Sequence, residues 1–305
     1  MKDFLTVEGF ERAELELLLD QADSFVDVLR RPIPKVPALR GKTVATLFFE
    51  PSTRTKLSFD RAAKALSADL MNFSPGGSSV SKGESLKDTV LTLKAMGPDL
   101  MIVRHQATGA PWQVAGWTGL PVINAGDGAH QHPTQAMLDA LTIRRRFGKL
   151  EGLHVGIVGD IRHSRVARSN VFALSTLGAD VTLIAPRTLL PVNHDGWPVT
   201  VTEDLDAVLE GLDVVYLLRI QAERGGLSVF PSLPEYVARY GLTQARFQAL
   251  QPDAVVMHPG PMNRGVEIAD VVADHERSLI LSQVENGVAV RMAVLFALLG
   301  GESNE

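Results

Sequence analysis

Apolar residues recur along this chain in two alternating patterns. Helical spacing predicts an amphipathic helix over residues 7–31, carried by Leu15, Leu18, Leu19, Ala22, Phe25 and Leu29. After it come short apolar runs typical of buried strands, at 44–49, 100–103, 122–123, 155–158, 181–184, 214–218 and 254–257. Helical patterns alternate with these runs near 53–67, 85–96, 133–147, 164–177, 203–210, 243–250 and 287–299. The alternation predicts an α/β fold of parallel sheets flanked by helices.

A charged stretch punctuated by glycine lies near the middle of the chain. Residues 144–152 read Arg-Arg-Arg-Phe-Gly-Lys-Leu-Glu-Gly, and a new strand–helix repeat begins after them. We therefore predict two domains, residues 1–149 and residues 150–286. Ligands of parallel sheets bind beyond the carboxyl ends of the strands, so the loops after strands are the places to look for a site.

Composition narrows the class of protein. The chain has 305 residues, 45% hydrophobic and 21% charged, which suits one large or two ordinary globular domains. The formal charge is −5 and no dense basic run occurs, so we expect no nucleic-acid partner. The absence of cysteine excludes disulfides, thiolate nucleophiles and cysteine-ligated zinc.

The apolar segments do not predict a membrane protein. The first residues lack the pattern of a signal peptide, and the apolar run 288–300 is interrupted by Arg291 and is too short to span a bilayer. We therefore expect a cytoplasmic protein without a membrane partner.

Two glycine-containing segments imitate nucleotide-binding motifs. Residues 41–43 (Gly-Lys-Thr) are similar to the end of a P-loop, but Val36 stands where its first glycine belongs and the segment precedes a strand. Residues 156–159 (Gly-Ile-Val-Gly) lie at a strand-to-helix turn, but the full glycine triplet of a dinucleotide site is missing. We interpret the second segment as a tight turn.

The segment 49–55 (Phe-Glu-Pro-Ser-Thr-Arg-Thr) follows the first predicted strand and opens a helix. Ser52 or Thr53 is placed to cap that helix. Its exposed backbone N–H groups, the hydroxyls and the Arg54 guanidinium would together form an anion cradle suited to phosphate. A capped helix with a solvated arginine explains the segment equally well when it is taken alone.

A second loop, residues 124–135 (Asn-Ala-Gly-Asp-Gly-Ala-His-Gln-His-Pro-Thr-Gln), also follows a strand and opens a helix. Pro133 suits the first helical turn, which places His132 at the cap and Gln135 in the first turn, where both can face a ligand. His130 and His132 have a metal-ligand spacing, but no third ligand is evident, so we expect no metal.

These segments, with Arg104-His105 after another strand, carry a family resemblance. Residues 52–55 and 132–135 together resemble the carbamoyltransferases, and the resemblance covers nearly the whole chain in order. Residues 81–85 (Ser-Lys-Gly-Glu-Ser), 219–224 (Arg-Ile-Gln-Ala-Glu-Arg) and 258–265 (His-Pro-Gly-Pro-Met-Asn-Arg-Gly) are similar to the aspartate-specific branch. The cysteine and the Ser-Met-Gly segment expected of the ornithine branch are absent.

The resemblance implies transfer of the carbamoyl group of carbamoyl phosphate to the amine of L-aspartate, a step of pyrimidine biosynthesis that needs no cofactor. It implies that the first domain binds carbamoyl phosphate, that the second binds aspartate, and that a final helix, 287–305, packs back on the first. The residues implied for carbamoyl phosphate are Ser52, Thr53, Arg54, Thr55, Arg104, His132, Gln135 and the backbone carbonyls of Gly260 and Pro261. Those implied for L-aspartate are Lys82, Arg165, Arg219 and Gln221.

The chemistry of carbamoyl transfer is consistent with these implied binding roles. The amine attacks the carbonyl carbon, and Thr55, Arg104 and His132 would stabilise the oxygen that gains negative charge. The carbamoyl NH₂ is a donor and needs acceptors such as Gln135.

The two carboxylates of aspartate call for two well-aimed cations, Arg165 and Arg219. Arg54 and Lys82 complete the implied catalytic set. Glu50 is expected to orient an arginine such as Arg165 or Arg224. No dedicated base is evident, so the leaving phosphate would take the proton of the amine.

The resemblance also implies a homotrimer with shared sites, because Ser78 and Lys82 match positions on a loop that reaches the neighbouring chain. Residues 74–83 are rich in glycine and small polar residues, which favours an exposed, mobile loop. Regulatory or dihydroorotase chains are further partners that the sequence neither requires nor excludes.

Two other functions compete with this one. A carbamoyltransferase for ornithine or an ornithine derivative would want acidic partners for a cationic side chain, whereas the loop offers Arg219, Gln221 and Arg224. A nucleotide-binding or non-catalytic regulatory α/β protein would need the glycine motifs that are incomplete here.

Overall fold

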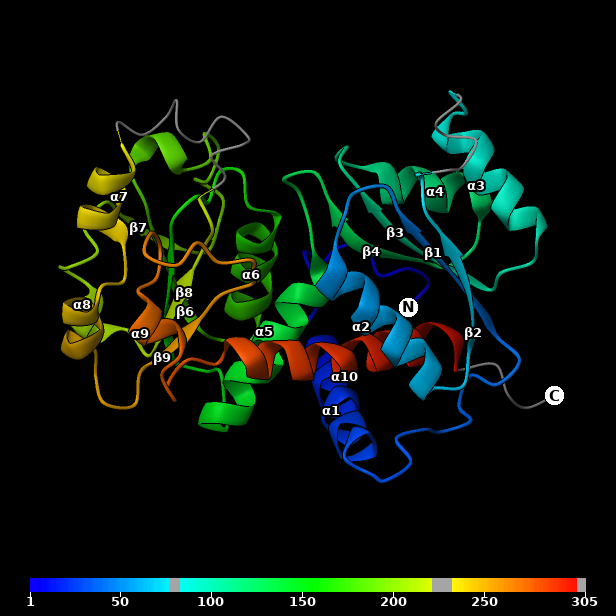
Figure 1. Ribbon diagram of the computed structural model, residues 1–305, viewed down its shortest axis with the longest axis horizontal. Coiled ribbons are helices and arrows are strands. Elements are labelled where there is room, and N and C mark those ends of the chain that lie inside the picture. The colour runs from blue at the N-terminus through cyan, green and yellow to red at the C-terminus, as the bar shows by residue number, and fades with distance from the viewer. Residues whose placement is uncertain (77–82, 221–231, 301–305) are drawn as a thin grey trace. The chain divides into compact units, whose positions relative to one another are not determined.

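The computed structural model describes residues 1–76, 83–220 and 232–300. It divides into two compact units: a first unit of Met1–Leu141 with the segment from Val284 onward, and a second unit of Thr142–Gln283. Each unit is a parallel sheet flanked by helices, which confirms the predicted α/β class (Figure 1). The division between the units lies inside helix α5 (Pro133–Phe147), a few residues before the domain boundary of 149–150 that the sequence predicts.

The first unit contains a parallel sheet with strand order β2-β1-β3-β4. Its strands are β1 (Thr43–Phe48), β2 (Asp69–Phe73), β3 (Leu100–His105) and β4 (Val122–Asp127). Its helices are α1 (Arg12–Leu29), α2 (Thr53–Ala65), α3 (Leu86–Ala95), α4 (Ala110–Thr118), the start of α5, and most of α10 (Ile280–Leu299). Figure 1 shows α3 and α4 on one side of the sheet and α1, α2 and α10 on the other.

The inner strands of this sheet are buried along almost their whole length, because helices cover both faces. They read as continuous apolar runs, which is why the sequence pattern found them. Strand β2 was missed, since it lies at the edge of the sheet, is partly exposed and includes the polar residues Asp69 and Asn72.

Helix α10 is longer than predicted, because it begins at Ile280 and not near residue 287. By length and hydropathy it could cross a membrane, and in the described ranges it is the one helix that could. However, 61% of its apolar window is buried inside the protein, as in a core helix. It packs against α1, where Phe25 and Phe296 make an edge-to-face contact with ring centroids 5.9 Å apart.

The second unit contains a parallel sheet with strand order β7-β6-β5-β8-β9. Its strands are β5 (His154–Val158), β6 (Asp180–Ile184), β7 (Thr200–Thr202), β8 (Val214–Leu217) and β9 (Val255–Met257). Its helices are α6 (Arg165–Thr176), α7 (Leu233–Tyr240), α8 (Gln244–Ala249) and α9 (Asp270–Ala273). Helix α6 lies on one side of the sheet, and α7 and α8 lie on the other (Figure 1).

The predicted helix over 203–210 is wrong. The structure has only a 3₁₀ turn at Leu209–Gly211, because Leu205 and Leu209 are the buried residues there and supply too little apolar surface for a longer helix. Helices α4, α7 and α9 and the short strand β7 were not predicted, since each is too short to show its period clearly.

Close packing explains the glycines at 156 and 159. A Cβ atom at Gly156 would lie 2.5 Å from Leu212 Cδ1, and one at Gly159 would lie 3.0 Å from the carbonyl oxygen of Leu218. Gly159 also has a φ of +122°, which other residues rarely adopt. Gly159 lies in the tight turn that follows β5, in agreement with our interpretation, whereas Gly156 lies within the strand itself.

The P-loop-like lysine, Lys42, lies just before β1, at the end of the strand opposite to the loops that would bind a ligand. Its ammonium pairs with Asp99 at 3.4 Å, and the same carboxylate accepts a hydrogen bond from Thr43 N at 2.7 Å. Lys42 therefore helps to align β1 with the neighbouring chain segment.

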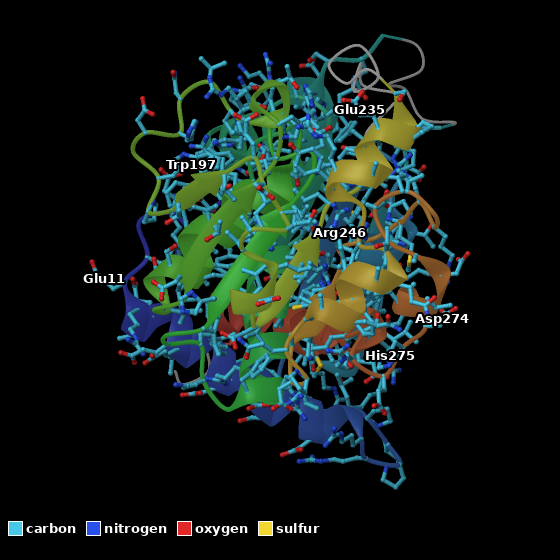
Figure 2. The ribbon with its side chains drawn as sticks, turned by 90° about the vertical axis from the view of Figure 1, so that its left-hand side faces the viewer. Glu11, Trp197, Glu235, Arg246, Asp274 and His275 are labelled. Atoms are coloured by element: carbon cyan, nitrogen blue, oxygen red, sulfur yellow. The ribbon has the colours of Figure 1, made fainter. Side chains whose placement is uncertain are left out.

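Arg246 ties α8 to α7 in the second unit (Figure 2). Its guanidinium pairs with Asp206 at 2.7 Å and donates to the carbonyl oxygens of Ala238 and Gly241, each at 2.9 Å. The hydrogen bond and the charge of Asp206 raise the pKa of Arg246. One side chain thus satisfies carbonyl groups at the end of α7.

Candidate active site

The loops that follow β1, β3 and β4 meet at one edge of the first sheet, because these strands are parallel neighbours. Phe49 N donates to the carbonyl oxygen of Arg104 at 2.9 Å, and Gly128 N donates to that of His105 at 3.0 Å. The structure therefore brings together three predicted segments, 52–55, 104–105 and 124–135.

The first of these segments begins helix α2. Pro51 precedes the N-cap residue Ser52, which has an extended backbone, and within the described residues the Ser52 side chain caps no helix N–H group. We had expected a hydroxyl cap, and its absence leaves the first-turn N–H groups available to an anion. Thr55 is buried, whereas the side chain of Arg54 is exposed. Partial desolvation nevertheless lowers the pKa of Arg54. An incoming anion would stabilise that charge.

Arg104 connects the strand ends. It is almost completely buried, its Nη1 donates to the carbonyl oxygen of Ala125 at 3.0 Å, and its Nη2 pairs with Glu50 at 3.3 Å. Glu50 thus has an arginine partner that we did not name in advance. Our expected partners were Arg165 and Arg224, and Arg224 lies outside the described residues.

His105 closes the same strand end. Its Nδ1 accepts a hydrogen bond from Ala107 N at 2.8 Å, and its ring lies 5.2 Å from that of Phe49. Desolvation lowers the pKa of His105 despite the opposing charge of Glu50. We therefore expect a neutral ring here at neutral pH.

Asp127, which sequence analysis did not single out, organises the glycine-rich loop before α5. Its Oδ1 accepts from Asn124 Nδ2 at 2.8 Å and from Gln131 N at 3.0 Å. Its Oδ2 accepts from Gly109 N at 2.7 Å and lies 3.1 Å from His130 Nδ1. Burial acts to raise the pKa of Asp127, but the hydrogen bonds from His130, Gly109 and Asn124 outweigh burial and lower it.

Gly128 is required in this loop. Its φ is +46°, and a Cβ atom there would lie 2.4 Å from Thr108 Oγ1 and 3.0 Å from Thr108 N. Any side chain would therefore push apart the loops that follow β3 and β4. An aspartate flanked by glycines at the end of a buried strand was the available signal for such an organising residue.

Helix α5 begins at Pro133, as predicted, and places His132 just before its first turn. The His132 carbonyl accepts from Gln135 N at 2.9 Å, and both side chains are nearly buried. His130 is instead held by Asp127 and lies 5.1 Å from the ring of Trp112. Among the described residues, no group of three or more His, Asp or Glu side chains could hold a metal.

The second unit carries the predicted arginines beyond neighbouring strands. Arg165 is the first residue of α6, after β5, and its helix is capped by Ser164 Oγ, which accepts from Ala167 N at 3.1 Å. Arg219 lies just past β8, which pairs with β5, and is half-buried. The carboxyl ends of paired parallel strands thus supply both cations.

The late loop, 258–265, is fixed by a buried histidine. His258 Nδ1 accepts from Gly260 N at 2.8 Å, so its Nε2 carries the proton donated to Glu267 at 3.2 Å. Glu267 also accepts from the backbone N–H of Asn263, whose side chain donates to the carbonyl oxygen of Ile220 at 3.5 Å. These contacts hold the loop of Gly260 and Pro261 beside the segment that contains Arg219.

Three predicted site residues, Ser78, Lys82 and Gln221, lie outside the described residues.

The chain matches two family models that cover most of its length. The aspartate/ornithine carbamoyltransferase carbamoyl-P binding domain matches residues 2–145. The aspartate/ornithine carbamoyltransferase Asp/Orn binding domain matches residues 151–298.

Two similar proteins bear the same name. The aspartate carbamoyltransferase catalytic subunit of Acidothermus cellulolyticus is 58% identical over 99% of this chain and 93% of that protein. Its namesake from Thermobifida fusca is 59% identical over 99% of this chain and 96% of that protein. Both alignments span both units.

Solved structures of aspartate transcarbamoylase from Trypanosoma cruzi have a similar fold. One, in complex with carbamoyl aspartate and phosphate, has a TM-score of 0.89 and 30% identity, and covers 98% of this chain and 96% of that one. Another, in complex with carbamoyl phosphate and aspartate, has a TM-score of 0.88 and 30% identity, and covers 98% of this chain and 97% of that one.

Proposed function

Given that this chain belongs to the aspartate/ornithine carbamoyltransferase family, we propose that it transfers the carbamoyl group of carbamoyl phosphate to L-aspartate. The products are N-carbamoyl-L-aspartate and phosphate. The observation that carries the proposal is the identity of 58–59% with proteins named aspartate carbamoyltransferase catalytic subunit over 99% of the chain. This relationship also disfavours a nucleotide-binding or non-catalytic function.

The first unit supplies the groups that carbamoyl phosphate needs. At the start of α2, the N–H groups and hydroxyls of Ser52 and Thr53 are available to bind an anion, and Arg54 adds a cation whose pKa is lowered by desolvation. Arg104, held rigidly by Ala125 and Glu50, presents a fixed guanidinium. A dianionic phosphate bound there is positioned without a metal or cofactor.

The transition state carries new negative charge on the carbonyl oxygen of the carbamoyl group. Thr55, Arg104 and His132 are donors held at the same sheet edge, and they stabilise that oxygen. Removal of one such donor typically lowers the rate by about 10²–10³-fold.

The second unit supplies Arg165 and Arg219 for the two carboxylates of aspartate. These cations favour aspartate over ornithine, whose side-chain ammonium they would repel. The attacking amine must be neutral. We assign its proton to the leaving phosphate, since the site residues described above include no obvious dedicated base.

The direct test supplies carbamoyl phosphate with L-aspartate or with L-ornithine and identifies the carbamoylated product by mass spectrometry. N-carbamoyl-L-aspartate as the main product supports the proposal. Citrulline as the main product would move the chain to the ornithine branch, and the absence of either product would reject carbamoyl transfer.

We further propose that the protein is a cytoplasmic homotrimer acting in pyrimidine biosynthesis, with active sites shared between chains. The family resemblance of Ser78 and Lys82 motivates the shared site. In a cyclic trimer, each chain donates a loop to one neighbour and accepts a loop from the other.

The test of sharing is complementation between Arg54→Ala and Lys82→Ala, each of which should be nearly inactive alone. When they are refolded together in equal amounts, roughly one site in four combines an intact Arg54 with a neighbour's intact Lys82. Recovery of about a quarter of wild-type activity supports sharing. Verified mixed trimers with no gain over their parents would reject it.

A further inference from the structure

A buried acid lies one helical turn after Gln135. Asp139 is 0% exposed and Gln135 is 8% exposed, and they lie on the same face of α5 because they are four residues apart. Gln135 Nε2 donates to Asp139 Oδ1 at 3.1 Å. An ionised carboxylate is acceptor-only, so the amide must turn its NH₂ towards Asp139 and its Oε1 away.

A buried cation from the end of the chain accompanies this acid. Arg291 of α10 is 3% exposed, its Nη1 donates to the carbonyl oxygen of Gly287 at 3.0 Å, and its guanidinium lies 5.0 Å from the centre of the Phe59 ring. Burial lowers the pKa of Arg291 to about 9, with Asp139 acting to raise it and Arg104 to lower it. The guanidinium of Arg291 thus attracts the negative charge of Asp139.

The glycine at 287 shows that α10 is shaped around this arginine. A Cβ atom at Gly287 would lie 2.6 Å from Arg291 Nη1 and 3.1 Å from Leu138 Cδ2 of α5. Glycine in a helix interior is disfavoured by about 1 kcal/mol relative to alanine. Its place here is explained by the space that the guanidinium occupies beside α5.

We propose that Asp139 is a positioning residue that holds the NH₂ of Gln135, so that Gln135 Oε1 accepts a hydrogen bond from the NH₂ of the carbamoyl group, with Arg291 as its buried counter-charge. This inference rests on the proposed function and deepens it, because it assigns the residue that fixes the orientation of the Gln135 amide. Were the amide reversed, its NH₂ would face the substrate NH₂, and two donors would meet. The Asp139–Gln135 pair thereby distinguishes a carbamoyl group from an acyl group of the same shape.

Acetyl phosphate is the matched probe, since it carries a methyl group where carbamoyl phosphate carries NH₂. In its reaction, the aspartate nitrogen forms a bond to the acetyl carbon, the carbon–oxygen bond to phosphate breaks, and N-acetyl-L-aspartate and phosphate result. The preference of the enzyme is the ratio of kcat/KM for carbamoyl phosphate to kcat/KM for acetyl phosphate, both with saturating L-aspartate.

Asp139→Asn is the decisive variant, because it keeps the shape of the side chain but allows either orientation of Gln135. We expect the carbamoyl preference to fall about tenfold, as for one lost hydrogen bond, while kcat/KM for acetyl phosphate changes less than threefold. Gln135→Met should lower the preference similarly, and the double variant should show no additional loss. Arg291→Met should also lower the preference, and Arg291→Lys should restore most of it.

The matched control is Thr134→Val, an isosteric change at a buried residue of the same helical turn. Within the described part of the chain, Thr134 Oγ1 makes no hydrogen bond, so this variant should keep the wild-type preference. A merely structural defect in Asp139→Asn would lower turnover of both acyl phosphates equally and leave their ratio unchanged, and that result would overturn the inference.

Circular dichroism establishes that each variant folds. Should Asp139→Asn not fold, Gln135→Met decides instead, because an unchanged preference there would mean that Gln135 is not the acceptor. If the wild-type enzyme makes no N-carbamoyl-L-aspartate, the proposed function and this inference both fail. If it is active and a folded Asp139→Asn keeps the wild-type preference, this inference alone fails.

Discussion

Asp127 offers a sharp test of how the glycine-rich loop is held. Its carboxylate accepts hydrogen bonds from the backbone N–H groups of Gly109 and Gln131 and from the side chain of Asn124, and it pairs with His130. In Asp127→Asn, one of the acceptor oxygens becomes an NH₂ group. In either orientation this donor faces a buried backbone N–H, of Gly109 or of Gln131.

The expected cost follows from these contacts. Losing one hydrogen bond to a charged acceptor costs about 1.5–3 kcal/mol of folding free energy. The remaining hydrogen bonds weaken because their acceptor is then a neutral amide, which adds about 1–2 kcal/mol. The total of about 3–5 kcal/mol corresponds to a fall in Tm of roughly 10 °C for a domain of this size. Calorimetry of the two proteins in the same buffer measures this difference, and hydrogen exchange of residues 105–132 localises it to the loop.

The dependence on pH supplies a second criterion. Since the folded pKa of Asp127 is lowered, its stabilisation is fully present above the unfolded value of about 3.9 and is lost as the pH falls through the folded value. The difference in Tm should therefore not shrink between pH 8 and pH 5. Equal Tm values at pH 7, or a difference that closes before pH 5, would refute the assignment.

Three further outcomes test the site. Arg54→Ala should lower turnover at least 10²-fold with an unchanged circular dichroism spectrum, and near-normal kcat would remove Arg54 from the phosphate site. Arg219→Ala should raise the aspartate KM by at least tenfold while carbamoyl-phosphate binding stays within threefold, since one charge-assisted bond contributes about 1.5–3 kcal/mol. The opposite pattern would place Arg219 at the phosphate. Dialysis against EDTA should leave activity unchanged, and a loss restored by a divalent cation would contradict that prediction.

The sequence predicted the buried strands and the loops after them because their physical signals are local. Strands β1 and β3 are covered on both faces and read as apolar runs, and the polar segments at their ends stand out against them. Edge strands such as β2 and β7 carry polar residues and have no such contrast. The predicted helix over 203–210 failed because local spacing alone does not show which side chains find a buried face.

The residues that support the site could not be predicted in the same way. Asp139 and Arg291 come from helices far apart in the sequence, and their shared burial appears only once α10 is placed against α5. The partner of Glu50 could not be predicted either, since nothing near Glu50 in the sequence identifies Arg104 as its partner. Motifs identify the side chains that point to a ligand, whereas the groups that hold those side chains depend on tertiary structure.

The return of the chain to the first unit has a consequence for biosynthesis. The second unit is inserted between Leu141 and Val284, so the first unit is assembled from segments on both sides of it. While the ribosome is still making the second unit, Phe25 lacks the ring of Phe296 and Asp139 lacks the cation of Arg291. A chain released before α10 is made would carry an uncompensated acid and an uncovered apolar surface, which are features that chaperones and proteases recognise. Completion of this fold, and with it the orientation of Gln135, therefore waits for α10 to leave the exit tunnel.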